Sequence, residues 1–170
     1  MGNMKPVKDI SLRNITNFPK LIDAFNETHF GAKNLFYAKN ILKEMFAEKC
    51  ICFLSFTANL IATGLRGIIK DLVKEKKFDI VITTCGALDH DISRSFREYY
   101  HGAFEADDTK LEKKNTHRLG NVFIPAENHG PVIEKTVQDL LKEIYKDNKE
   151  LATYELCWEI GKKLNESSFL

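Results

Sequence analysis

The chain has 170 residues, the length of one domain, and a chain of this size can bury roughly 70% of its unfolded surface. Its composition, 44% hydrophobic and 29% charged, is that of a soluble globular protein, and a net charge of +1 argues against nucleic acid or an anionic membrane as partner. Without a run of about 18 apolar residues or an apolar signal core, we expect a cytoplasmic protein with no membrane span.

The four cysteines form no recognised pattern. Cys50 and Cys52 flank a single residue inside an apolar run, and Cys85 and Cys157 stand alone. Neither a disulfide framework nor a C-x-x-C zinc site is indicated by this spacing. We therefore expect four buried thiols in a reducing compartment.

Residues 1–50 are predicted to form helices. A short helix is expected within residues 14–25, because Asn17 can cap its amino-terminal end and Pro19 lies in its first turn. A longer amphipathic helix is expected after Gly31, where apolar residues recur at helical spacing. The apolar stripe of this helix is expected to contribute to a core.

Three short apolar runs after these helices are predicted to be strands. Their bounds are Cys50–Phe56, Phe78–Thr84 and Asn121–Pro125. Strands covered on both faces have this nearly all-apolar composition. We therefore expect the three runs to belong to one parallel sheet that is buried on both faces.

The segments between and after these strands carry helical periodicity. One helix is expected over residues 57–77, one within residues 88–101, one opening at Pro131 and one over residues 153–164. The charged segment 106–118 lacks the periodicity and is expected to be a loop or lid. Strands that alternate with helices indicate the α/β class with a parallel sheet.

A sheet of three strands is narrow for this class. Parallel sheets are usually wider and covered on both faces, and an unpaired edge invites pairing with another chain. The sequence stops just after a helix, where another strand would be due. We therefore expect either a partner chain or a second half.

Polar and small residues follow the first two strands, where helices are expected to begin. The two junctions are Thr57–Asn59 and Thr84–Gly86. In open α/β sheets, ligands bind beyond the carboxyl ends of the strands, near the free N–H groups of helix amino termini. The junctions either bind a nucleotide or only cap their helices. Neither G-x-G-x-x-G nor G-x-x-x-x-G-K-[ST] is present to decide between these readings.

A charged cluster, Asp89-His90-Asp91, lies just beyond the second junction. Adjacent helical residues point about 100° apart, so one metal ion is hard to reach and no metal site is expected. A carboxylate beside a histidine would suit the ammonium groups of a polyamine. Acid–base chemistry and simple helix capping are the alternatives. The other histidines, His129 among them, are expected at the surface or at caps. No nucleophile stands out, because Cys85 has no evident base and the lysines lie in polar segments.

Four ordered segments carry a resemblance to a known family. They read ITNFPKLIDAFNETHFGAKNL, FLSFTANLIATGLRGIIKDLVKEKKFDIVITTCGALDHDISRSF, HRLGNVFIPAENH and ELCWEIGKKLNESSFL. Together they resemble the amino-terminal half of deoxyhypusine synthases, above all the archaeal forms. The resemblance extends from about Pro6 to Leu170.

The resemblance implies a fold and an activity. Members of the family are homotetramers of Rossmann-like subunits with active sites at dimer interfaces. They use NAD to oxidise spermidine, hold its aminobutyl fragment as an imine on a lysine, and transfer the fragment to a lysine of the hypusine-bearing translation initiation factor. The catalytic lysine lies in the family's second half, so no catalytic residue is expected in this chain.

By this resemblance, residues 51–170 would form a βαβ NAD-binding half-domain that lacks the carboxyl-terminal catalytic half. The chain would then need that half, as a separate polypeptide or a missing segment. Two alternatives remain. One is a non-catalytic regulatory paralogue that assembles with a full-length synthase, and the other is an enzyme similar to homospermidine synthase.

The resemblance also assigns site residues. Asp89 and His90 fall where eukaryotic members carry a glutamate pair that meets spermidine and the nicotinamide side of NAD, so both are expected to bind substrate. His90 departs from that pair, although archaeal sequences share the departure. The residues expected to bind NAD are Ala58, Asn59, Leu60, Ile61, Ala62, Thr84, Cys85, Gly86 and His90.

Overall fold

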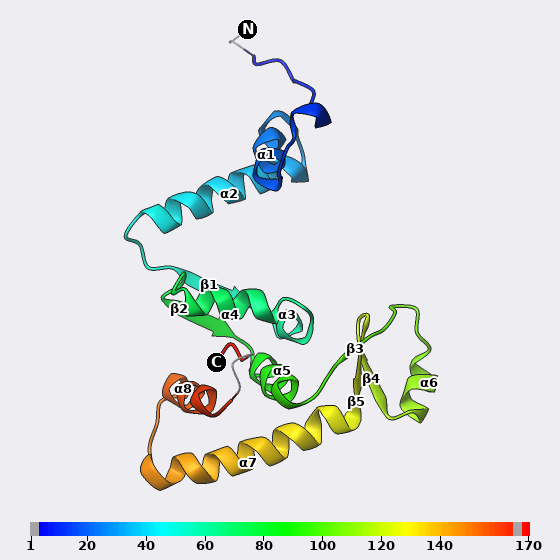
Figure 1. Ribbon diagram of the computed structural model, residues 1–170, viewed down its shortest axis with the longest axis vertical. Coiled ribbons are helices and arrows are strands. Elements are labelled where there is room, and N and C mark those ends of the chain that lie inside the picture. The colour runs from blue at the N-terminus through cyan, green and yellow to red at the C-terminus, as the bar shows by residue number, and fades with distance from the viewer. Residues whose placement is uncertain (1–3, 165–167) are drawn as a thin grey trace. The chain divides into compact units, whose positions relative to one another are not determined.

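The computed structural model describes residues 4–164 and 168–170 (Figure 1). The chain divides into two compact units, Met1–Cys52 and Phe53–Leu170. Within the described residues, each helix is too short or too polar to cross a membrane. The expected role of residues 51–170 as an NAD-binding half-domain remains a prediction.

The first unit is helical, as predicted. Asn17 caps its first α-helix, since the Asn17 side chain accepts a hydrogen bond of 3.0 Å from the Lys20 backbone N–H. Ile22 is the buried residue of this helix, whereas Phe30 is 95% exposed. The elements of the unit are η1 (Leu12–Asn14), α1 (Phe18–Ala24), η2 (Phe25–Glu27) and α2 (Gly31–Ala47).

The second unit begins with two parallel strands, β1 (Phe53–Phe56) and β2 (Ile80–Thr83). Phe56 pairs with Thr83, and the Thr83 hydroxyl donates a hydrogen bond of 2.8 Å to the Phe56 carbonyl. The first two predicted strands are therefore confirmed, and their carboxyl ends lie at the same sheet edge.

The expectation that this sheet is buried on both faces is wrong for the chain as described. Ile82 is 54% exposed and Phe53 is 55% exposed. The reason is that the parallel sheet contains two strands within the described residues, so part of its apolar surface has no covering layer.

Two helices, α3 (Asn59–Ala62) and α4 (Arg66–Lys74), replace the single helix expected over residues 57–77. The chain leaves the helical path at Thr63, which has extended backbone angles. The Arg94 guanidinium donates hydrogen bonds of 2.7 Å to the Ile61 carbonyl and 2.6 Å to the Thr63 carbonyl. Arg94 therefore satisfies carbonyl groups that a continuous helix would have used internally.

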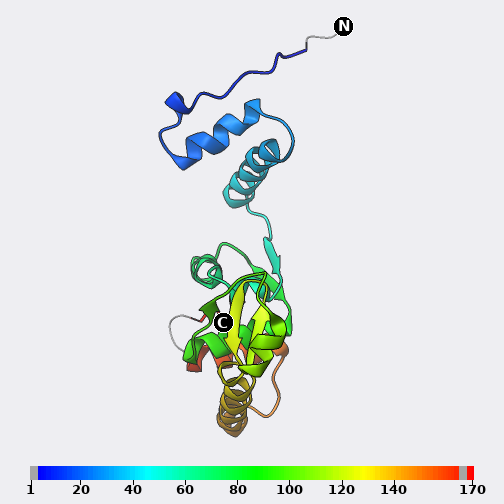
Figure 2. The ribbon, with the colours of Figure 1, turned by 90° about the vertical axis from the view of Figure 1, so that its right-hand side faces the viewer.

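The third predicted strand belongs to a different sheet, so its assignment to the parallel sheet is wrong. Strands β3 (Tyr100–His101), β5 (Val122–Pro125) and β4 (Thr116–Leu119) form an antiparallel sheet in that order. Figure 2 shows β4 and β5 side by side. Gly120, with φ of +61°, adopts the left-handed conformation that the tight turn between them requires.

The prediction of a loop or lid at residues 106–118 is also wrong, because this segment is largely regular secondary structure. It contains α6 (Asp108–Lys113) and most of β4. The Asp107 side chain caps α6 by accepting hydrogen bonds from the backbone N–H groups of Thr109 and Lys110, at 3.1 and 3.2 Å. This cap nucleates a short helix where apolar periodicity is absent.

Three longer helices complete the second unit and confirm the helices predicted there. They are α5 (Cys85–Phe96), α7 (Gly130–Asp147) and α8 (Thr153–Lys163), and η3 (Ala126–Asn128) precedes α7. Ile92, Ile144 and Ile160 form a buried cluster that joins the three helices. A second cluster packs Phe56 of β1 with residues of three helices and of the carboxyl-terminal segment, namely Ile61, Ile69, Ala87 and Phe169.

The cysteines are less buried than expected. Cys52 is buried and Cys157 is partly buried, but Cys50 and Cys85 are exposed. Cys85 is exposed because it opens α5 at the edge of the sheet, where the chain turns away from β2.

Candidate functional site

The two polar junctions lie against each other at the carboxyl edge of the parallel sheet. Because β1 and β2 are neighbours in register, residues 57–59 and 84–86 leave the sheet side by side. A Cβ atom added at Gly86 would lie 3.1 Å from the Ala58 Cβ atom. Glycine therefore allows the first turn of α5 to approach the start of α3 this closely.

The residues of the first junction differ in what they can offer to a ligand. Asn59 is exposed, and its amide oxygen accepts a hydrogen bond from the Thr57 hydroxyl. The Asn59 amide nitrogen is then left as a donor that faces no partner among the described residues. Ile61 is fully buried and Ala62 is 3% exposed. These two side chains support the turn from the core and can offer a ligand only their backbone.

The second junction is more accessible. Thr84 and Cys85 are exposed and Gly86 is partly buried. Thr84 is the amino-terminal cap residue of α5, and its side chain makes no capping hydrogen bond. The hydroxyl of Thr84 and the first N–H groups of α5 are thus available at the same edge as Asn59.

The structure separates the charged cluster into two parts. Asp89 and His90 are partly buried, whereas Asp91 is completely buried. Asp91 Oδ1 accepts a hydrogen bond of 2.6 Å from Arg66 Nε, and Asp91 Oδ2 accepts one of 2.6 Å from the Ser168 hydroxyl. Asp91 is therefore a structural residue that joins α4, α5 and the carboxyl-terminal segment.

His90 belongs to an aromatic and imidazole cluster that the sequence analysis missed. The Tyr99 hydroxyl lies 2.9 Å from His90 Nδ1 and 3.0 Å from His129 Nδ1. The two imidazole rings stack, with ring centroids 5.0 Å apart. His129 does precede α7 as its cap residue, but its side chain makes no capping hydrogen bond and turns to His90 instead.

Burial sets the charge state of this cluster. Burial, together with the smaller effects of the nearby His129 and Arg94, lowers the pKa of His90 to about 4, so His90 is neutral near pH 7. Burial also lowers the pKa of His129, against the opposing effect of the Asp89 carboxylate. The pKa of the Tyr99 hydroxyl is raised by burial, so the phenol keeps its proton.

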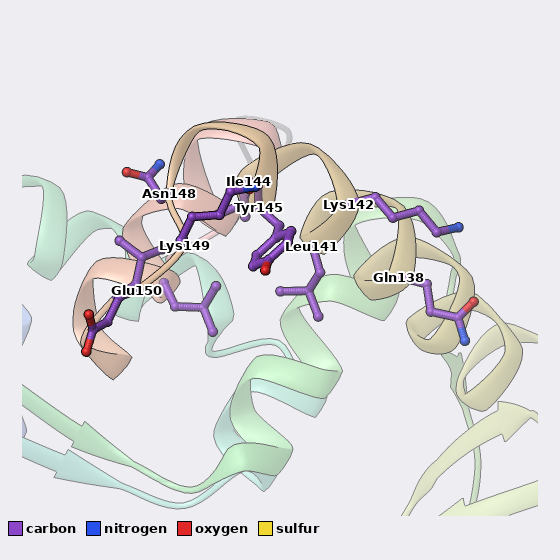
Figure 3. A pocket seen from close by; sticks show the side chains of 10 residues that line it. Gln138, Leu141, Lys142, Ile144, Tyr145, Asn148, Lys149 and Glu150 are labelled. Carbon is purple, nitrogen blue, oxygen red and sulfur yellow. The ribbon is translucent and has the colours of Figure 1, made fainter.

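A cavity elsewhere in the unit contains none of the predicted site residues. It has a volume of about 550 Å³ and lies along the end of α7, the following segment and α8. Figure 3 shows Leu141 and Tyr145 of α7 at this cavity, with Lys149 beside Tyr145. Lys149 Nζ lies 3.8 Å from the centroid of the Tyr145 ring. Most of its lining comes from the end of α7 and the segment that follows, and α8 contributes Leu156.

Across the described ranges 4–164 and 168–170, no group of three or more histidine, cysteine, aspartate or glutamate side chains is placed to hold a metal ion.

Comparison with known proteins identifies the family. The sequence profile described as deoxyhypusine synthase matches residues 20–170. A "Probable deoxyhypusine synthase" of Picrophilus torridus is 48% identical over 165 residues, and one of Sulfolobus acidocaldarius is 47% identical over 162 residues. These alignments cover 96% and 94% of this chain, but 53% and 52% of the relatives. The chain spans about half the length of the curated relatives it matches.

A solved structure supports the fold. A protein of Entamoeba histolytica, provisionally assigned as a deoxyhypusine synthase, superimposes with a TM-score of 0.61 and 18% sequence identity. The superposition covers 96% of this chain and 59% of the other. Because the sequence profile covers most of the chain and the archaeal relatives align over nearly its whole length, this chain belongs to the deoxyhypusine synthase family.

Proposed function

We propose that this chain is the amino-terminal half of a deoxyhypusine synthase. In this role it would bind NAD and one part of spermidine. The carboxyl-terminal half would supply the catalytic lysine, either from the same polypeptide or from a separate one. The complete enzyme would transfer the 4-aminobutyl group of spermidine to a lysine of the hypusine-bearing translation initiation factor, in a tetramer-like assembly.

The observation that carries this proposal is the contact between the two junctions at Gly86 and Ala58. Two strand-to-helix turns with small residues meet there, and exposed donor groups of Asn59 and Thr84 flank them. A dinucleotide needs this combination, because its pyrophosphate and riboses require close backbone approach and hydrogen-bond donors. The residues present therefore fit NAD.

Different residues of the two junctions would have different roles in binding NAD. Asn59, Thr84 and the first N–H groups of α5 would bind polar groups of NAD, while Ala58, Cys85 and Gly86 would leave room for it. Leu60, Ile61 and Ala62 would hold the first turn in place from the core. When bound, NAD supplies the acceptor for the hydride that is removed from spermidine.

Asp89 is the residue proposed to bind the polyamine. It lies one turn into α5, beyond the second junction, and it is partly exposed. Its carboxylate can accept charge-assisted hydrogen bonds from an ammonium group. In contrast, the carboxylate of Asp91 is occupied by Arg66 and Ser168 and is not available to a ligand.

The uncovered apolar surface of the parallel sheet supports the need for a second half. Ile80, Val81 and Ile82 of β2 are 41%, 37% and 54% exposed. Strands of parallel sheets are normally buried, and an unpaired edge favours pairing with another strand. A carboxyl-terminal half that adds strands and a covering layer would bury these side chains.

NAD titration by calorimetry tests the site, with the carboxyl-terminal part of the Picrophilus torridus relative present. Gly86→Ala places a Cβ atom 3.1 Å from Ala58 Cβ, whereas Gly67→Ala in α4 meets nothing within 4 Å. The added Cβ atom should push the two turns apart and occupy room that the dinucleotide needs, so Gly86→Ala should weaken NAD binding by about tenfold, or about 1.4 kcal/mol, while Gly67→Ala leaves it unchanged. Equal NAD affinity in the wild type and both variants would refute the proposed site.

Two assays separate the two other functions expected from the sequence. A regulatory paralogue would bind a full-length synthase and change its rate without adding a site of its own. An enzyme similar to homospermidine synthase would transfer the aminobutyl group to putrescine. Product analysis of the two mixed halves, with putrescine and the initiation factor as competing acceptors, tests for the second of these functions. The rate of a full-length synthase with and without this chain tests for the first.

A further inference from the structure

Two cysteines at the end of the first unit bring their sulfur atoms into contact. Cys50 Sγ lies 3.6 Å from Cys52 Sγ, and a single residue separates the two in the sequence. Cys50 is exposed, whereas Cys52 is buried, with 5% of its surface exposed. One thiol of the pair can therefore meet a reagent from solution, and the other is screened from solvent but within reach of the first.

Backbone carbonyl groups orient both thiols. Cys50 Sγ lies 3.3 Å from the Met45 carbonyl oxygen, and Cys52 Sγ lies 3.8 Å from the Cys50 carbonyl oxygen. Met45 belongs to the last turn of α2, where carbonyl groups have no partner inside the helix. A thiol is a weak donor that can serve such a carbonyl. These contacts keep the two sulfur atoms close together instead of letting them turn away from each other.

The backbone around the pair can accommodate a bond between the sulfur atoms. Because α2 ends at Ala47 and β1 begins at Phe53, both cysteines lie outside helix and strand. A disulfide would bring the sulfur atoms from 3.6 Å to about 2.05 Å. A shift within residues 48–52 can provide this approach and leave the parallel strand pair intact, since its register starts at Phe53 and Ile80.

We propose that Cys50 and Cys52 form a thiol–disulfide exchange site for low-molecular-weight disulfides. In the first step, the Cys50 thiolate attacks one sulfur atom of the small disulfide, whose sulfur–sulfur bond breaks, and half of the reagent leaves as a thiolate. In the second step, Cys52 gives up its proton and attacks Cys50 Sγ, so the Cys50–Cys52 bond forms and the other half leaves. Two electrons pass from the two cysteines to the reagent, and the two thiol protons end on its halves.

The bond should be easily reversed. It closes a loop of three residues, and so short a loop restricts the unfolded chain very little. Exposed or strained disulfides are also the ones that reducing agents break most readily. The site should therefore clear a small thiol from Cys50 under oxidising conditions and return to two thiols under reducing ones. The proposal concerns residues of the first unit and does not depend on the proposed function.

Peptide mass spectrometry tests the site. The full chain is incubated with oxidised glutathione, its remaining thiols are alkylated, and it is digested with trypsin. Cleavage after Lys49 and Arg66 gives a peptide of residues 50–66 that carries both thiols, while Cys85 and Cys157 fall in the peptides 78–94 and 150–162. We expect the wild-type peptide 50–66 to be lighter by two hydrogen atoms and to carry no glutathione. A dithiol reductant should restore both thiols.

Three variants separate the roles of the thiols. Cys52→Ser lacks the second attacking thiol, so glutathione should remain on Cys50 at a level at least about tenfold above that of the wild type. Cys50→Ser should leave the buried Cys52 largely unmodified. Cys85→Ser, at the other exposed cysteine, should not change the disulfide in the peptide 50–66.

The wild-type peptide decides the outcome even if a variant is unstable. Glutathione that stays on the wild-type peptide 50–66, a peptide that does not react, or a disulfide that joins it to the peptide with Cys85 or Cys157 would each overturn the proposal.

Discussion

Replacing Asp91 with asparagine should strongly destabilise the second unit. The Asp91 carboxylate is completely buried, and Arg66, its partner at 2.6 Å, has a side chain that is 8% exposed. Asparagine has nearly the same shape but no charge. At present Asp91 Oδ2 accepts hydrogen bonds from the Ser168 hydroxyl at 2.6 Å and from the Phe169 backbone N–H at 3.1 Å. The amide group of asparagine would place its own N–H donors against one of these donor groups.

The magnitude follows from the charge that is left behind. Removing one partner of a buried ion pair typically costs about 3–5 kcal/mol, because the remaining charge stays buried without compensation. Arg66 keeps hydrogen bonds to the Ser95 hydroxyl at 2.7 Å and to the Arg94 carbonyl at 3.2 Å, which favours the lower end of this range. A loss of about 3 kcal/mol is a large part of the roughly 5–15 kcal/mol that stabilises a typical protein.

Urea unfolding followed by circular dichroism measures the effect. With a denaturant slope of about 2 kcal/mol/M, Asp91→Asn should lower the unfolding midpoint by about 1.5 M. Asp139→Asn is the control, because Asp139 and Lys142 form an exposed pair at 3.5 Å that should contribute less than about 1 kcal/mol. A loss below about 1 kcal/mol in Asp91→Asn would refute the view that Asp91 anchors the unit.

Three further predictions concern packing, access and pH. Phe169 is 7% exposed and packs edge-on against Phe56, so Phe169→Ala should lower the free energy of unfolding by about 3 kcal/mol in the same urea assay. Phe18→Ala, at a 72% exposed position, should lower it far less. Similar losses in the two variants would contradict the assignment of Phe169 to the core. Maleimide should modify both exposed thiols, Cys50 and Cys85, as read by mass spectrometry. If Cys85 lies at the cofactor, NAD should slow the reaction of Cys85 alone. Equal protection of both thiols, or of neither, would contradict this placement. Because the pKa of His90 is about 4 in the folded chain and 6.5 in the unfolded one, the unfolded chain binds more protons between these values, so stability is complete above about pH 6.5 and falls as the pH falls toward 4. After allowance for partial exposure, urea unfolding at pH 7 and pH 5 should show a loss about 1–2 kcal/mol smaller in His90→Gln than in the wild type, and an identical loss in both would contradict the shift.

The sequence predicts the parallel strand pair well because its signal is local. Residues 53–56 and 80–83 lie in apolar runs followed by helix-starting residues, and both became strands. The run at 122–125 has the same composition, yet it pairs with β4 across the turn at Gly120. A short apolar run does not reveal which sheet it will join, so this assignment could not be made from composition.

Other differences arise from partners that are distant in the chain. The break between α3 and α4 is stabilised by Arg94, about 30 residues away, while apolar spacing continues through the break. The contact of His90 with Tyr99 and His129 likewise requires three segments to meet. In contrast, α6 was detectable, because Asp107 is followed by residues that favour a capped helix.

In the candidate site, too, the features set by local sequence could be predicted and those set by distant contacts could not. The sequence indicates strand-to-helix junctions at Thr57–Asn59 and Thr84–Gly86, and the structure brings Gly86 of the second against Ala58 of the first. Which member of Asp89-His90-Asp91 is buried could not be deduced, because the burial of Asp91 depends on Arg66 and on residues 168–170. The binding roles of the junction residues and of Asp89 and His90 stay predictions.

The most direct test of the proposed function is a transfer assay with two halves. The chain is mixed with the carboxyl-terminal part of the Picrophilus torridus relative, NAD, spermidine labelled in its aminobutyl group and the hypusine-bearing initiation factor. We expect label on one lysine of the factor with both halves present, and none with either half alone. Transfer by this chain alone, or a stable complex of the two halves that binds NAD but transfers nothing, would contradict the account.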